Sequence, residues 1–96
     1  MTETVIQYLR DNRERFLETL NEFLAIPSVS TDSNYKQDVE WAADFLIDYL
    51  EKLSFENIEK METPGHPIVY AEYNGAGDRA PTVLFYGHYD VQPADP

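Results

Sequence analysis

A histidine and an aspartate separated by one residue, His88 and Asp90, are the two side chains of this sequence best placed to do chemistry. They follow an unbroken apolar run at residues 83–86 and a glycine, which is the pattern of a strand buried on both faces. In an extended backbone, residues two apart project to the same side, so the imidazole and the carboxylate would face one site while Tyr89 points away. A neutral imidazole is a good ligand for Zn²⁺, and a nearby carboxylate can be a second ligand or can orient the ring. The pattern is therefore typical of a metal site.

The pair alone has a simpler interpretation, a strand-end histidine hydrogen-bonded to a nearby acid, because two residues at this spacing recur by chance. Its surroundings are more specific. The run Leu84-Phe-Tyr-Gly-His-Tyr-Asp-Val-Gln-Pro93 resembles the first metal-ligand motif of the M20 family of zinc metallopeptidases, in the subgroup of dipeptidases related to carnosine dipeptidase. Ile26-Pro-Ser-Val-Ser30 and the segment 42–53 also match the family at similar distances. The resemblance covers nearly the whole chain but only part of the family fold.

This resemblance implies an α/β fold. Residues 1–96 would be the incomplete N-terminal portion of a single catalytic domain, in which a mixed central sheet is flanked by helices. It also implies that His88 is a ligand to one of two zinc ions and that Asp90 is the catalytic-site acid that orients this imidazole. The other metal ligands and a glutamate general base would lie later in the chain, so the 96 residues alone are expected to be inactive.

For the full-length protein, the resemblance implies a homodimeric enzyme that hydrolyses the amide bond of dipeptides with metal-activated water. Val91-Gln-Pro93 favours a dipeptidase over the family's other main activity, the deacylation of N-acyl amino acids. In a different class, the chain could be a non-catalytic α/β module that uses an aromatic helix face to associate with itself or a partner. These alternatives stay open at the level of sequence.

The composition of the chain limits the kinds of partner that it can bind. The 96 residues suit one small domain or a piece of a larger one, and the 43% hydrophobic content is that of a chain that folds. The formal net charge of −11 disfavours nucleic acid and anionic membranes, because such a surface repels phosphates. Most of the acidic residues are scattered along predicted helices, where they form a solvated face rather than a ligand cluster.

The sequence contains no cysteine, which excludes disulfides and thiolate zinc sites, so any metal must be held by histidine and carboxylates. The N-terminal residues Met1-Thr-Glu-Thr4 show no basic flank and no long apolar run, and we read no signal peptide or membrane span there. A cytoplasmic protein is the expectation that follows.

Two helical regions are predicted by the spacing of apolar residues. The first extends from Thr4 toward Pro27, as one long helix or as two short ones on either side of a polar interval at residues 10–15. The second, at about residues 36–53, has a continuous apolar stripe and a neighbouring aromatic row that we expect to pack in the core. The stripe consists of Val39, Ala42, Ala43, Leu46, Leu50 and Leu53, and the row of Trp41, Phe45 and Tyr49.

The second half of the chain is predicted to be a sheet. Residues 55–61 and 68–73 have strand patterns and are separated by a turn at 63–67, and Asn74-Gly-Ala-Gly77 is a strong hairpin signal. Strands 68–73 and 82–86 would then be antiparallel neighbours, giving the element order α-α-β-β-β.

Three other side chains are candidates for chemistry. Ser28 and Ser30 have neither a neighbouring histidine nor the sharp glycine-flanked turn of a catalytic serine, and loop formation and helix capping explain them better. The resemblance adds that their segment can line the wall of the catalytic cleft. His66 lies in a turn between Gly65 and Pro67, and we interpret it as a surface residue rather than a ligand.

Overall fold

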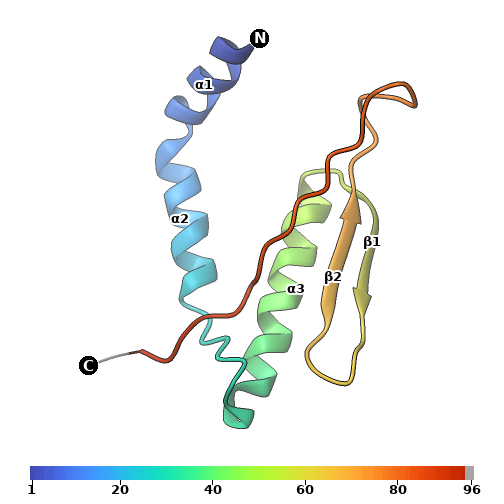
Figure 1. Ribbon diagram of the computed structural model, residues 1–96. Coiled ribbons are helices and arrows are strands. Elements are labelled where there is room, and N and C mark those ends of the chain that lie inside the picture. Colours follow the sequence, from blue (N-terminus) through green and yellow to red (C-terminus); the bar gives the residue numbers. More distant parts are fainter. Residues whose placement is uncertain (95–96) are drawn as a thin grey trace.

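The computed structural model describes residues 1–94. Its elements are α1 (Thr2–Asp11), α2 (Arg13–Leu24), the short 3-10 helix η1 (Ser33–Tyr35), α3 (Lys36–Lys52), β1 (Glu56–Met61) and β2 (Ile68–Glu72) (Figure 1). The predicted domain range 1–96 also includes Asp95 and Pro96, which lie outside the described residues.

The N-terminal helical region is two short helices, which confirms one of the two predicted alternatives. The break falls at Asn12, inside the polar interval, where the side-chain amide donates a hydrogen bond of 2.9 Å to the carbonyl oxygen of Tyr8. The second helix ends at Leu24, before Pro27, as predicted. None of the helices formed by residues 1–94 combines the length and apolar character needed to cross a bilayer.

The long helix α3 carries the core. Its predicted stripe is confirmed in the first half of the helix, where Val39, Ala42 and Ala43 are buried. Farther along the stripe, Leu46 and Leu50 are half-buried and Leu53 is exposed. Ile26 and Val29, from the loop that follows α2, complete the small set of buried hydrophobic side chains. The core therefore lies between the first half of α3 and the loop 25–32.

The aromatic row of α3 is only partly packed. The Phe45 ring stacks on Phe23 of α2, with centroids 5.6 Å apart, and so connects the two helices. Trp41, in the same row, is exposed, so the prediction that it packs in the core was wrong for this chain.

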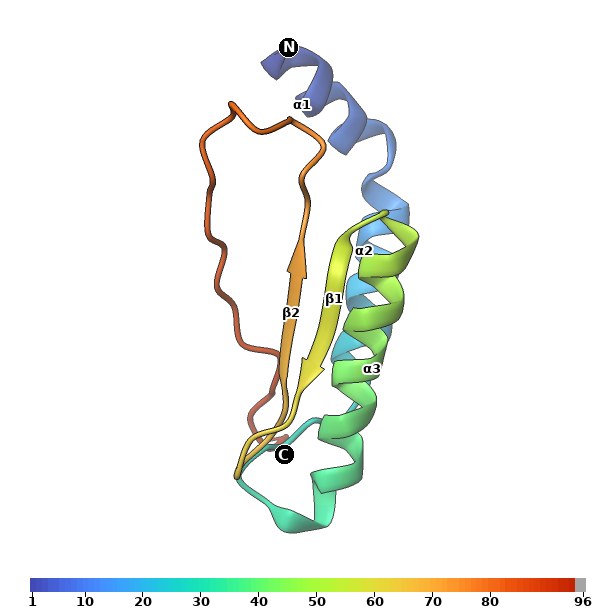
Figure 2. The same cartoon turned by 90° about the vertical axis from the view of Figure 1, so that its right-hand side faces the viewer.

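Strands β1 and β2 form an antiparallel pair that lies against α3 (Figure 2). An ion-pair cluster links the pair to the helix: the Lys60 ammonium of β1 lies 2.6 Å from a Glu40 carboxylate oxygen and 3.0 Å from one of Asp44. Hydrogen bonds to Glu40 and then to Asp44 hold the pKa of Lys60 above its ordinary value. The two predicted strands and the turn between them are thus confirmed.

The third predicted strand, at residues 82–86, is wrong for this structure. The turn after β2 forms, with the Gly77 N–H donating to the Asn74 carbonyl at 3.1 Å. In a second turn the Ala80 N–H donates to the Gly77 carbonyl. Pro81 has no N–H that could donate to a neighbouring strand. The chain leaves the edge of β2 and returns as an unpaired extended segment (Figure 2). The side chains of residues 83–86 are 70–91% exposed, so the observed sheet has two strands instead of three.

The end of α3 offers a stabilising substitution. Ser54 has a φ of 65° and follows the helix in a Schellman-type ending, with the Phe55 N–H on the Leu50 carbonyl and the Ser54 N–H on the Glu51 carbonyl. A left-handed conformation costs a serine about 1–2 kcal/mol, and a glycine avoids this cost. Glycine also loses more conformational entropy on folding, which offsets part of the stabilisation. We therefore expect Ser54→Gly to raise the free energy of unfolding by about 0.5–1 kcal/mol in a denaturant titration. A loss of stability would show that this turn does not need the left-handed conformation.

Candidate metal-binding site

The predicted pair meets as the sequence indicates. The His88 Nδ1 atom lies 2.7 Å from Asp90 Oδ1, and Tyr89 points away, its hydroxyl donating to the Pro67 carbonyl. An ionised carboxylate can only accept, so Nδ1 carries the proton and donates. In a neutral imidazole the lone pair is then on the other ring nitrogen, Nε2, and the side chain is 77% exposed. This is the tautomer and orientation in which a histidine binds a metal ion through Nε2.

Asp90 has a second partner that sequence reasoning did not assign to the site. The Ser30 hydroxyl donates to Asp90 Oδ2 at 2.5 Å, so each carboxylate oxygen accepts one side-chain hydrogen bond. The hydrogen bond from Ser30, and then the one from His88, hold the pKa of Asp90 below its ordinary value. The carboxylate is therefore ionised at neutral pH. The only sequence signal for Ser30 was the family-like Ile26–Ser30 segment, expected at the wall of a cleft.

The segment 88–91 is fastened to the loop after α2 by two further hydrogen bonds. The buried Ser28 hydroxyl donates to the Tyr89 carbonyl at 3.1 Å, and the Val91 N–H donates to the Ser28 carbonyl at 3.0 Å. Ser28 is thus a structural anchor, in agreement with its interpretation as a loop residue rather than a nucleophile. In Figure 1 the C-terminal segment crosses this loop just below α2.

The turn between β1 and β2 also contacts the loop 25–32. His66 Nε2 lies 2.8 Å from the Ser30 carbonyl, and a carbonyl accepts, so this ring donates through Nε2. His66 is half-buried rather than a fully exposed surface residue, and its Nε2 is already engaged. Its predicted place in a turn is confirmed, and the contact gives it a role in holding the loop 25–32.

The donor set fits a metal ion in part. His88 supplies one nitrogen ligand, and Asp90 orients it, which is the pairing that zinc sites use. Within residues 1–94, no three histidine, cysteine, aspartate or glutamate side chains converge tightly enough to hold an ion by themselves. A catalytic zinc needs about three protein ligands, so further ligands must come from elsewhere.

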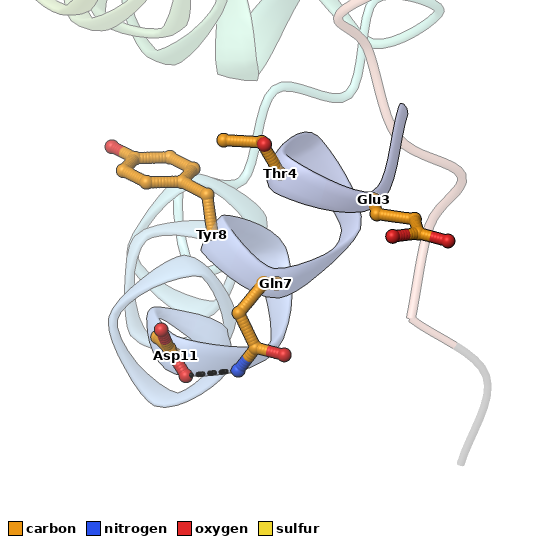
Figure 3. Close-up of a pocket in the computed structure, with 5 residues that line it drawn as sticks. All are labelled: Glu3, Thr4, Gln7, Tyr8 and Asp11. Carbon is orange, nitrogen blue, oxygen red and sulfur yellow. Dashed lines mark hydrogen bonds between the residues drawn. The ribbon is translucent and has the colours of Figure 1, made fainter. Parts of the chain in front are cut away.

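A hollow on the outer face of α1 is not part of this site (Figure 3). Two of its lining side chains are joined by a hydrogen bond, which the Gln7 amide donates to Asp11 at 2.7 Å. All the lining side chains are exposed and come from one helix, which gives no convergent polar groups. They are Glu3, Thr4, Gln7, Tyr8 and Asp11.

Comparison with known proteins shows which proteins this chain is similar to. No family model matches the chain. The Cys-Gly metallodipeptidase DUG1 of Candida albicans is 36% identical over 97 residues, covering 90% of this chain and 20% of that protein. The Beta-Ala-His dipeptidase of Rattus norvegicus is 34% identical over 104 residues, covering 96% of this chain and 21% of that protein. The solved structure of the dipeptidase Dug1p from Saccharomyces cerevisiae superposes with a TM-score of 0.85 and 30% identity, over 96% of this chain and 21% of that one.

The matches define the class of protein: the chain is homologous to the N-terminal part of metallodipeptidases, with the α/β fold of that part. It belongs to the M20 family, as the motif around His88 predicted. The chain spans about a fifth of the length of the curated relatives it matches.

Proposed function

We propose that this chain is the N-terminal part of a zinc-dependent dipeptidase that hydrolyses the amide bond of dipeptides. The observation that carries the proposal is the His88–Asp90 contact of 2.7 Å, which leaves Nε2 of an exposed imidazole free to bind a metal ion. Support comes from relatives that are named metallodipeptidases or dipeptidases and are at least 30% identical to this chain over the aligned residues.

In this proposal, residues of this chain bind a metal ion and orient the side chain that holds it. His88 would hold one ion of a zinc pair through Nε2, and Asp90 keeps the ring in the required tautomer and raises its basicity. When bound, the zinc pair supplies Lewis acidity and lowers the pKa of a bound water from about 16 toward 7, which makes hydroxide available at neutral pH. The remaining ligands and the general base are assigned to the part of a dipeptidase that this chain does not span.

Metal removal tests the proposal on the full-length protein that contains this chain. We expect a chelator to abolish hydrolysis of Cys-Gly and β-Ala-His, and zinc to restore it, because the metal generates the nucleophile. N-acetyl amino acids, assayed in parallel, are expected to react much more slowly.

Each other outcome identifies an alternative. A preference for N-acetyl amino acids would support a deacylase of the same family. Zinc-reconstituted protein that hydrolyses neither class, while it self-associates, would contradict the enzyme and favour the non-catalytic module.

A further inference from the structure

We propose that Ser30 is a positioning residue of the metal site: its hydroxyl fixes the Asp90 carboxylate and, through it, the metal-binding orientation of His88. The inference rests on the proposed function and goes beyond it, because it assigns a role in the metal site to Ser30, which lies 60 positions before Asp90 in the sequence.

The geometry shows how the hydroxyl can act. Oδ1 of Asp90 accepts from His88 Nδ1 at 2.7 Å, while Oδ2 accepts from Ser30 Oγ at 2.5 Å. The terminal torsion of an aspartate is broad, so a carboxylate held at one oxygen can swing. Held at both, it cannot rotate without breaking one hydrogen bond. Ser30 therefore fixes the plane in which Asp90 presents Oδ1 to the imidazole.

The exposure of the pair makes this restraint necessary. The His88 and Asp90 side chains are 77% and 39% exposed, so packing alone does not hold them. A ligand whose orientation is not fixed loses conformational entropy when the metal binds, which weakens the affinity. A hydroxyl that restricts the carboxylate beforehand reduces that loss.

Ser30 can restrain Asp90 because its own backbone is held from two sides. On one side, the residues Ile26, Ser28 and Val29 that precede it in the loop are buried, and Ser28 hydrogen-bonds to the backbone of the site segment. On the other side, His66 binds the Ser30 carbonyl at 2.8 Å. The hydroxyl thus projects from the best-packed part of the molecule toward an exposed pair.

The test compares Ser30→Thr with Ser30→Val in the full-length protein, because these two side chains have nearly the same volume and differ in the hydroxyl. Zinc affinity is measured by competition with a chromogenic chelator. We expect Ser30→Val and Ser30→Ala to bind zinc about tenfold more weakly than the wild type, the lower end of the effect of removing an outer partner of a metal ligand. Ser30→Thr should recover most of the affinity.

Ser33→Ala is the matched control. This exposed serine lies close by in η1, and its side chain makes no hydrogen bond within residues 1–94, so zinc affinity should stay unchanged. A merely structural role for Ser30 would lower the stability of the metal-free protein without separating Thr from Val in zinc affinity, and equal affinities of these two variants would overturn the proposal. A zinc-bound crystal structure of the wild type gives an independent measurement. Ser30 Oγ farther than about 3.5 Å from Asp90 would also overturn it.

His88→Ala distinguishes a failure of the role proposed for Ser30 from a failure of the proposed function. If it abolishes zinc binding while Ser30→Val binds as well as Ser30→Thr, this inference fails and the proposed function stands. If it leaves zinc binding intact, the proposed function itself fails.

Discussion

His88→Ala is expected to reduce both zinc affinity and dipeptide hydrolysis of the full-length protein by more than about a hundredfold, because a direct ligand should matter more than its outer partners. The substitution removes the nitrogen ligand that Asp90 orients. The fold should be unaffected, since the His88 side chain is 77% exposed. Zinc competition, steady-state hydrolysis of Cys-Gly and circular dichroism measure the three quantities.

His66→Gln is the matched comparison. The glutamine amide can still donate to the Ser30 carbonyl, as His66 Nε2 does, so the loop should keep its place and zinc affinity should change far less. Dipeptidase activity retained by His88→Ala would count against the assignment of this residue as a ligand.

Ile26→Ala is expected to have the largest effect on stability, a loss of about 2–4 kcal/mol in the free energy of unfolding. Ile26 is 2% exposed and is one of the largest fully buried side chains of the described residues, so its truncation leaves a cavity in a small core. Because it begins the loop that carries Ser28 and Ser30, zinc affinity should fall as well.

Leu24→Ala provides the control for Ile26. This leucine ends α2 and is 53% exposed, so its truncation should change the free energy of unfolding by no more than about 0.5 kcal/mol. Denaturant titration of both variants gives the comparison. Equal losses would mean that the core is not centred on the loop 25–32.

The elements that depend on local periodicity could be predicted from the sequence. The second helical region was expected at about residues 36–53 and is α3, Lys36–Lys52, because its apolar stripe repeats at helical spacing. The strands at 56–61 and 68–72 follow the same logic, with a turn between them that the chain can close on its own. In each case the sequence pattern and the packing partner lie within about forty residues.

The segment 82–86 shows where local pattern fails. Four consecutive apolar residues predict a strand buried on both faces, but burial requires neighbours that the run itself does not specify. In the described chain this segment has no ladder partner, and its side chains remain exposed.

One contact of the candidate site could likewise be predicted from the sequence, and another could not. The contact between His88 and Asp90 was predictable because residues two apart in an extended chain share a side, and the extended backbone persists without a sheet. The Ser30 contact joins positions 60 apart, and no spacing rule encodes it. It arises from the meeting of the loop after α2, the β1–β2 turn and the site segment.

Anomalous diffraction at the zinc edge, from crystals of the full-length protein grown with zinc, tests most directly whether His88 is a metal ligand. We expect a zinc peak about 2.1 Å from His88 Nε2, with Asp90 still hydrogen-bonded to Nδ1 on the opposite side of the ring. Zinc bound elsewhere, with His88 Nε2 facing solvent, would contradict it.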